Sequence, residues 1–236
     1  MAIDANTWWL DEAAYAGREH FDEQHARRYD AKEDAGAADE VALLRRLGAL
    51  EAESTVVDLG AGTGQFTLAA APGCARVVAV DVSPVMLERL RENVARAGAA
   101  NVEVVHSGFL TYEHRGAPAD VVYSRLALHH LPDFWKAIAL RRIAGVLRPG
   151  GVLRLWDIVY GFEPADAERA IEGWIADTTG ADVEREWTRA ELAEHIRDEH
   201  STFTWLLEPM IARAGLEIVE ADRPDAVSAR YVCRRR

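Results

Sequence analysis

Short runs of β-branched residues alternate with longer helical patterns between about residues 54 and 160, and this alternation constrains the fold more than any other feature. It predicts strands over 54–59, 75–81, 101–107, 119–124 and 150–159, and helices over 64–71, 83–98 and 132–147. The "RPGG" of residues 148–151 is typical of a helix stop followed by a turn. Alternation of this kind indicates βα units around a mostly parallel sheet.

The flanking regions have a different character. Residues 1–50 are helical in pattern, and residues 161–202 are acidic and helical in period. The remaining sequence predicts a helix over 202–215 and strands over 216–222 and 228–234. A chain of 236 residues can bury one substantial core. We therefore expect one domain over 1–236, with an N-terminal helical lid (1–50), a ligand-binding core (54–160), an inserted helical cap (161–202) and a final helix with two strands (203–236).

Composition narrows the class of partner. The formal net charge is -12 and the arginines are dispersed among acids, which disfavours nucleic acid. The sequence has no long apolar run, and its start lacks the pattern of a signal peptide, so we expect a cytoplasmic protein without a membrane partner. Cys74 and Cys233 are not spaced like metal ligands and are interpreted as structural thiols. None of these features fixes an oligomeric state.

The stretch "VVDLGAGTGQF" (56–66) places glycines at 60, 62 and 64, directly after the first strand. Such a turn lets the backbone approach a ligand closely, because a Cβ there would collide with it. A dinucleotide fingerprint, G-x-G-x-x-G, would need a glycine where Gln65 stands. A tight turn without a ligand is the alternative.

Two acids stand beside this loop. Asp58 ends the first strand, where a carboxylate opposes a pyrophosphate but suits an ammonium group. Asp81 closes the second strand, where an acid can accept both hydroxyls of a ribose. Together with the glycine spacing, the two acids fit a nucleoside that carries an amino acid better than one that carries phosphates.

Four segments, "VVDLGAGTG", "VVAVDVSPVML", "ADVVYSRLALHHLPD" and "LRPGGVLRLWD", in this order and spacing, resemble the class I S-adenosylmethionine-dependent methyltransferases. The resemblance covers residues 54–160 well and the last two strands loosely. It implies an α/β fold with a Rossmann-like, doubly wound sheet of seven strands, the last of them antiparallel. It also implies S-adenosyl-L-methionine as cofactor, across the carboxyl ends of the first strands.

The resemblance implies the cofactor-binding residues as well. Asp58 would hold the methionine amino group directly or through water, Asp81 the ribose, and Val82 and Met86 the adenine. Members of the family usually carry an acid after the third strand, on the adenine amino group, where this chain has Gly108. The other implied contacts are the loop residues Gly60, Ala61, Gly62 and Gly64, Phe109 stacking on the adenine, a backbone contact from Ser124 near the sulfonium, and Tyr29, within a lid-like segment 19–33, reaching the cofactor carboxylate. A solvated helix is the alternative for that segment.

Methyl transfer from a sulfonium is an in-line displacement, so the enzyme mainly orients the reactants and excludes water, and a base is optional. His130 follows the fourth strand and His200 lies between the cap and the last helix; both are candidate catalytic residues. Loop capping by hydrogen bonds is the alternative for each. No metal is expected, because His195, Glu199 and His200 do not follow the H-E-x-x-H order and show no third ligand.

A small molecule is the expected acceptor, because "SRLA" after the fourth strand does not resemble the motif that holds a flipped base. Tryptophans 8, 9, 174, 187 and 205 could wall its pocket or simply fill the core of the cap. Two other functions stay open: a non-catalytic S-adenosylmethionine-binding regulator and, with less support, an NAD-dependent oxidoreductase.

Overall fold

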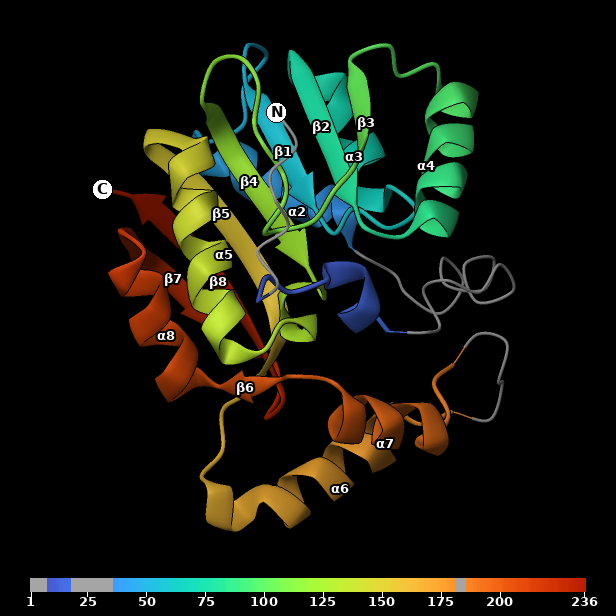
Figure 1. Ribbon diagram of the computed structural model, residues 1–236, viewed down its shortest axis with the longest axis vertical. Coiled ribbons are helices and arrows are strands. Elements are labelled where there is room, and N and C mark those ends of the chain that lie inside the picture. Colours follow the sequence, from blue (N-terminus) through green and yellow to red (C-terminus); the bar gives the residue numbers. More distant parts are fainter. Residues whose placement is uncertain (1–7, 18–35, 181–185) are drawn as a thin grey trace.

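In the computed structural model, which describes residues 8–17, 36–180 and 186–236, a mixed sheet forms the centre of the molecule (Figure 1). Its strands follow the order β3-β2-β1-β4-β5-β8-β7, and a short β6 pairs with β5. The first five strands are parallel, and β8 is antiparallel to both of its neighbours. The strands are β1 (Thr55–Leu59), β2 (Arg76–Asp81), β3 (Val102–His106), β4 (Ala119–Arg125), β5 (Leu147–Tyr160), β6 (Thr202–Phe203), β7 (Leu216–Asp222) and β8 (Ser228–Arg235). The predicted fold class is confirmed.

Helices cover both faces of the sheet because the strands are apolar on both sides. In β1, Val56 packs into a core with Phe66, whereas Val57 packs into the opposite core with Leu140. Figure 1 shows one helix layer behind the sheet and the other in front. The first layer consists of α2 (Ala37–Arg46), α3 (Gln65–Ala70) and α4 (Pro84–Ala97), and the second of α5 (Asp133–Val146) and α8 (Thr204–Arg213).

The predicted turn at 148–151 is wrong. Helix α5 does stop at Val146, but the following residues already belong to β5. Leu147 pairs with Ala119, and the next pair is Val152 with Val121, so the extra residues form an irregularity within the ladder. Gly150, at φ +76°, supplies the conformation that this irregularity requires. The pattern "RPGG" therefore marks a bulge in a paired strand rather than a connection.

A smaller difference concerns residues 202 and 203, which were predicted as the start of the last helix. They form β6 instead, parallel to the end of β5, and α8 begins at Thr204. Pairing with a free strand edge satisfies their backbone groups before the helix starts.

The cap lies beyond the carboxyl ends of β4 and β5, as Figure 1 shows. It contains α6 (Ala167–Thr178) and α7 (Arg189–Asp198). Helix α7 begins with a capping box, in which Thr188 and Glu191 satisfy each other's backbone N–H groups. The helical character predicted for this region is therefore confirmed in the residues that the structure describes.

Near the N-terminus, residues 8–17 contain the short 3-10 helix η1 (Glu12–Tyr15). Tyr29 lies outside the described residues. The two cysteines are buried free thiols, Cys74 just before β2 and Cys233 in β8, as expected. Within the described ranges, no helix combines the length and apolar character needed to cross a bilayer.

Candidate functional site

The glycine turn between β1 and α3 is built from left-handed backbone. Gly60, Gly62 and Gly64 have φ values of +75°, +53° and +92°. A Cβ at Gly60 would lie 2.3 Å from the Cβ of Ala127, and one at Gly64 would lie 2.2 Å from a methyl of Leu90, whereas one at Gly62 would meet nothing within 4 Å. Gly60 and Gly64 therefore permit close packing, and Gly62 borders open space.

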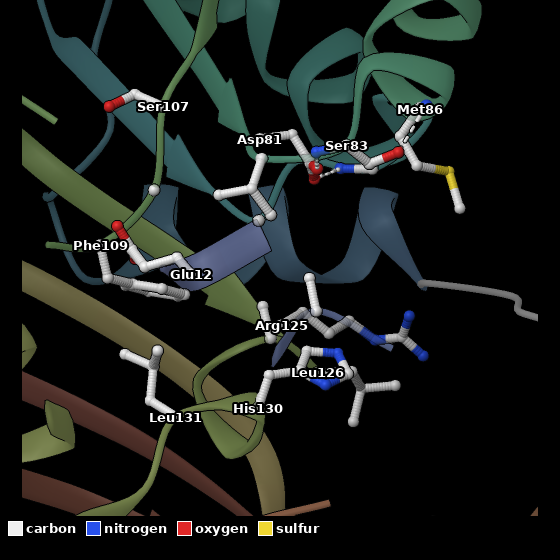
Figure 2. Close-up of a pocket in the computed structure, with 16 residues that line it drawn as sticks. Glu12, Asp81, Ser83, Met86, Ser107, Phe109, Arg125, Leu126, His130 and Leu131 are labelled. Atoms are coloured by element: carbon white, nitrogen blue, oxygen red, sulfur yellow. Dashed lines mark hydrogen bonds between the residues drawn. The ribbon is translucent and has the colours of Figure 1, made fainter. Parts of the chain in front are cut away.

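Asp81 fixes the other side of this turn. Its Oδ2 accepts a hydrogen bond from the backbone N–H of Gly62 at 2.8 Å, and its Oδ1 accepts one from Ser83 at 2.8 Å. Ser83 in turn caps α4, accepting a hydrogen bond from the N–H of Met86 at 3.1 Å. The carboxylate is thus held by backbone groups at the edge of a pocket (Figure 2).

The pocket lies at the carboxyl end of the sheet. Figure 2 shows Asp81, Ser83 and Met86 on one side, Arg125, Leu126 and His130 on the other, and Glu12 beside Phe109 at one end. Among the described residues, its lining is Glu12, Ala16, Gly60, Gly62, Asp81, Val82, Ser83, Met86, Ser107, Gly108, Phe109, Arg125, Leu126, Ala127, His130 and Leu131. Eight residues proposed from the sequence meet here: Gly60, Gly62, Asp81, Val82, Met86, Gly108, Phe109 and His130.

Asp58 is not part of the pocket lining. Its side chain is buried behind the glycine turn and accepts a hydrogen bond from Thr67 Oγ1 at 2.6 Å. Burial, reinforced by the neighbouring charge of Asp81, raises the pKa of Asp58 to about 7. From this position the carboxyl holds Thr67 in the first turn of α3, and any link from it to a ligand would need a bridging group.

Three further candidates also stand outside the lining. Ala61 packs against the apolar cluster that contains Leu87, Gly64 faces Leu90, and Ser124 is fully buried in β4. Their predicted contacts with a cofactor stay predictions.

Glu12 is a pocket residue that the sequence analysis missed. It comes from η1, yet its Oε1 accepts a hydrogen bond from the N–H of Leu110 at 3.0 Å and its Oε2 one from Thr111 Oγ1 at 3.1 Å. A Cβ at Gly108 would lie 2.4 Å from Glu12 Oε1, so this carboxylate occupies the space that the missing side chain leaves. Burial raises the pKa of Glu12. No local motif marks this residue, because its partners are far away in sequence.

The loop after β4 forms the opposite wall. Leu126, at φ +48°, is the one non-glycine residue with a positive φ among those that the structure describes. Strained backbone of this kind concentrates at functional sites. The guanidinium of Arg125 lies 4.4 Å from the centroid of the Trp156 ring, a cation–π contact that holds the arginine at the pocket edge.

His200, the second catalytic candidate, does not line this pocket. The centroid of its ring lies 5.5 Å from that of Tyr15, and its backbone N–H donates to the carbonyl of His129 at 3.1 Å. Burial and the nearby Lys136 ammonium lower the pKa of His200. The two candidate histidines therefore occupy different surroundings.

His129 connects the core to the cap. Its Nδ1 contacts Asp157 of β5, and its Nε2 lies 2.9 Å from Glu199 Oε2. His195 Nδ1 lies 2.5 Å from the same oxygen. Burial acts to lower the pKa of His129, but the two carboxylates raise it to about 10. Burial alone would raise the pKa of Glu199, but the two histidines hold that pKa well below its usual range.

The tryptophans proposed as pocket walls do not line the pocket in the part of the chain described. Trp8 stacks on Trp135 with ring centroids 5.8 Å apart, and Trp174 lies 6.2 Å from His195. The side chain of Trp205 is exposed and stacks on Phe203. Of these three, Trp174 fits the alternative in which the rings fill the core of the cap, whereas Trp8 and Trp205 pack outside it.

Comparison with known proteins agrees with this geometry. Residues 56–151 match the sequence pattern of a family described as a methyltransferase domain. Trans-aconitate 2-methyltransferase of Methylobacterium radiotolerans is 37% identical over 53% of this chain and 45% of its own length. A 27-O-demethylrifamycin SV methyltransferase of Amycolatopsis mediterranei is 33% identical over 52% of this chain and 47% of its own. The chain thus spans about half the length of these curated relatives.

Solved structures share the whole fold. Magnesium protoporphyrin IX methyltransferase from Synechocystis PCC 6803, solved with bound SAM, covers 97% of this chain with a TM-score of 0.65 at 14% identity, over 99% of its own length. An S-adenosylmethionine-dependent methyltransferase from Mesorhizobium loti covers 82% of the chain and 96% of its own, with a TM-score of 0.59 at 21% identity. Residues 56–151 of the chain thus match a methyltransferase-domain family, within a fold that these solved methyltransferases share.

Proposed function

We propose that this protein binds S-adenosyl-L-methionine in the pocket between Asp81 and Phe109 and transfers its methyl group to a small-molecule acceptor. The observation that carries the proposal is the position of Asp81. Two backbone N–H groups orient its carboxylate at the pocket edge, beside the open space over Gly62. A carboxylate held in this way can accept hydrogen bonds from the two hydroxyls of a ribose.

The adenine is assigned to the apolar lining residues Val82, Met86 and Phe109, of which Met86 lies on the side of Asp81 and Phe109 at the end beside Glu12 (Figure 2). These side chains offer apolar and aromatic surface to a flat ring. Glu12 takes the role of the acid that the family carries after the third strand, because its carboxylate lies where Gly108 has no side chain. One of its oxygens would accept a hydrogen bond from the adenine amino group in addition to the backbone contact it already has.

The methionine end of the cofactor is assigned to Gly60, Gly62 and the loop after β4. The buried Asp58 acts there through an intervening group, because it does not line the pocket. Ala61, Gly64 and Ser124 support this end through their backbone, and Tyr29 remains the candidate for the cofactor carboxylate.

His130 is the candidate base for the acceptor. It lines the pocket at the carboxyl end of the sheet, across from Asp81 (Figure 2). An imidazole there could take a proton from an attacking hydroxyl or carbon acid, whereas an amine that arrives neutral needs no base. His200 stands outside the lining and would reach an acceptor only from the cap side.

Two measurements test the proposal. Calorimetric titration with S-adenosylmethionine and with NADH should give binding of the first alone, since the glycine spacing departs from the dinucleotide fingerprint. Tight binding of NADH without binding of S-adenosylmethionine would replace the proposal with the oxidoreductase alternative.

A screen of metabolite extracts for transfer of a labelled methyl group tests the reaction itself and would identify the acceptor. Label should appear in a small molecule and not in added DNA or RNA. Binding of the cofactor, combined with no transfer to any extract fraction, would favour the regulator.

A further inference from the structure

A second group of chemically active side chains lies outside the pocket lining, between the core and the cap. It consists of His129 from the loop after β4, together with His195 and Glu199 from α7 and its C-terminal cap. One ligand atom of each lies within 4.8 Å of the others. The exposed fraction of these side chains is 5%, 18% and 13%, so the group is largely shielded from water.

The three ligand atoms lie close enough together to share one small cation. Zinc binds imidazole nitrogen and carboxylate oxygen at about 2.0–2.2 Å, which puts two of its ligand atoms roughly 3–4 Å apart. His129 Nε2 lies 2.9 Å from Glu199 Oε2, and His195 Nδ1 lies 2.5 Å from it. Both imidazoles therefore face one carboxylate oxygen. These two separations are shorter than zinc-ligand spacing, so the Glu199 carboxylate would move away from the nitrogens by up to about 1 Å to bind the ion.

Asp157 completes the arrangement from behind. It contacts His129 Nδ1, and its Oδ2 accepts a hydrogen bond from the backbone N–H of His129 at 3.1 Å. A carboxylate on the far ring nitrogen fixes the tautomer that presents Nε2 to a metal and raises its basicity. Asp157 and Glu199 bring two carboxylates to the group, whose negative charge a divalent ion would balance.

We propose that His129, His195 and Glu199 form a binding site for one Zn²⁺ ion, with Asp157 as the residue that orients His129. Two imidazoles and one carboxylate are a donor set typical of zinc, and they leave a fourth position for water or a substrate atom. The sequence did not predict this site, because there His195 and Glu199 were grouped with His200. The third ligand is His129 instead, brought to α7 by the loop that follows β4.

The ion would attach the cap to the edge of the cofactor pocket. His129 and the pocket residue His130 are consecutive, and their ring centroids lie 4.3 Å apart. The backbone N–H of His200 also donates to the carbonyl of His129 at 3.1 Å, so the end of α7 and the loop after β4 are already joined. Metal binding would hold α7 in this position. The proposal does not depend on methyl transfer, and its test needs no cofactor.

The test is metal binding to the full-length chain, freed of metal by a chelator and carrying no histidine tag. Equilibrium dialysis should give one Zn²⁺ per chain. Substitution of the ion by Co²⁺ should give the intense visible absorption of a tetrahedral site. The variants His195→Gln and Glu199→Gln should each weaken binding by at least about 100-fold, because each removes one of three protein ligands. The matched control His200→Gln, adjacent in sequence, should keep both stoichiometry and spectrum.

Two outcomes would overturn the proposal. One is a wild-type chain that binds no stoichiometric Zn²⁺ and gives no tetrahedral Co²⁺ spectrum, which would leave a hydrogen-bonded cluster of two acids and two histidines. The other is a loss of binding in His200→Gln with retention in His195→Gln, which would assign the ion to other ligands. The wild-type spectrum decides the question even where a variant does not fold.

Discussion

The cofactor side and the cap side of this molecule both carry ionisable groups but organise them differently. On the cofactor side, the bond from Gly62 to Asp81 joins two segments that recognisable motifs mark, at the ends of the adjacent strands β1 and β2. On the cap side, His129 meets Asp157 and Glu199, which come from remote parts of the chain. Local motifs can therefore mark the first site in a sequence, whereas only the folded chain reveals the second.

The largest expected effect on cofactor binding comes from filling the space over Gly62. The change Gly62→Val should weaken S-adenosylmethionine binding at least about 1,000-fold, because the new side chain projects into the open space beside Asp81. Isothermal titration calorimetry measures the loss. Gly98→Val is the matched control, since Gly98 has a φ of +64° and equally open surroundings but lies at the end of α4. Equal losses in both variants would indicate backbone strain instead of a blocked site.

The pH dependence of the free energy of unfolding tests whether Asp58 is held as a buried acid on the cofactor side. The raised pKa of this acid means that the folded chain holds the proton more tightly than the unfolded chain, so its contribution to stability is fully present below about pH 4. It is lost as the pH rises to about 7, by at most about 4 kcal/mol. The variant Asp58→Asn lacks this loss, and its stability relative to wild type should rise between pH 4 and 7 in urea unfolding. A constant difference over that range would contradict the assignment.

His130 lies where the two regions meet. The variant His130→Ala should lower turnover by about 100-fold if the acceptor requires deprotonation, with cofactor affinity nearly unchanged. His114→Ala is the matched control, because His114 is bonded to Tyr112 and Ala117 away from the pocket. Single-turnover rates and calorimetry separate the two effects. Equal turnover in wild type and variant would remove His130 from the mechanism.

Glu12 is an exception on the cofactor side, because it reaches the pocket from a distant segment of the chain. The variant Glu12→Gln should weaken S-adenosylmethionine binding by about 10-fold, since a charged acceptor is replaced by a neutral one beside Phe109. Asp11→Asn, one residue earlier at the start of η1, should leave the affinity unchanged. An unaltered affinity in Glu12→Gln would contradict the adenine contact and leave Glu12 as a support for the loop of Leu110.

Periodicity was sufficient to place most strands and helices of the core, because it reports local backbone geometry, and the family resemblance implied the antiparallel last strand. The prediction from sequence failed at 148–151, where the same residue types that make turns also make a bulge once a partner strand is present. The contact that the resemblance implies for Asp58, directly or through water, stays a prediction, because this side chain is buried outside the pocket lining. The sequence also missed Glu12 and the link from His129 to Glu199, because these contacts join distant segments and no residue spacing encodes them.

The central claim is that S-adenosylmethionine binds between Asp81 and Phe109, and a crystal structure of the complex with S-adenosylhomocysteine tests it most directly. The account predicts both ribose hydroxyls within hydrogen-bond distance of the Asp81 carboxylate, the adenine against Phe109 and Met86, and the sulfur toward the loop after β4. Density for the nucleoside elsewhere, with Asp81 bonded only to Gly62 and Ser83, would contradict it.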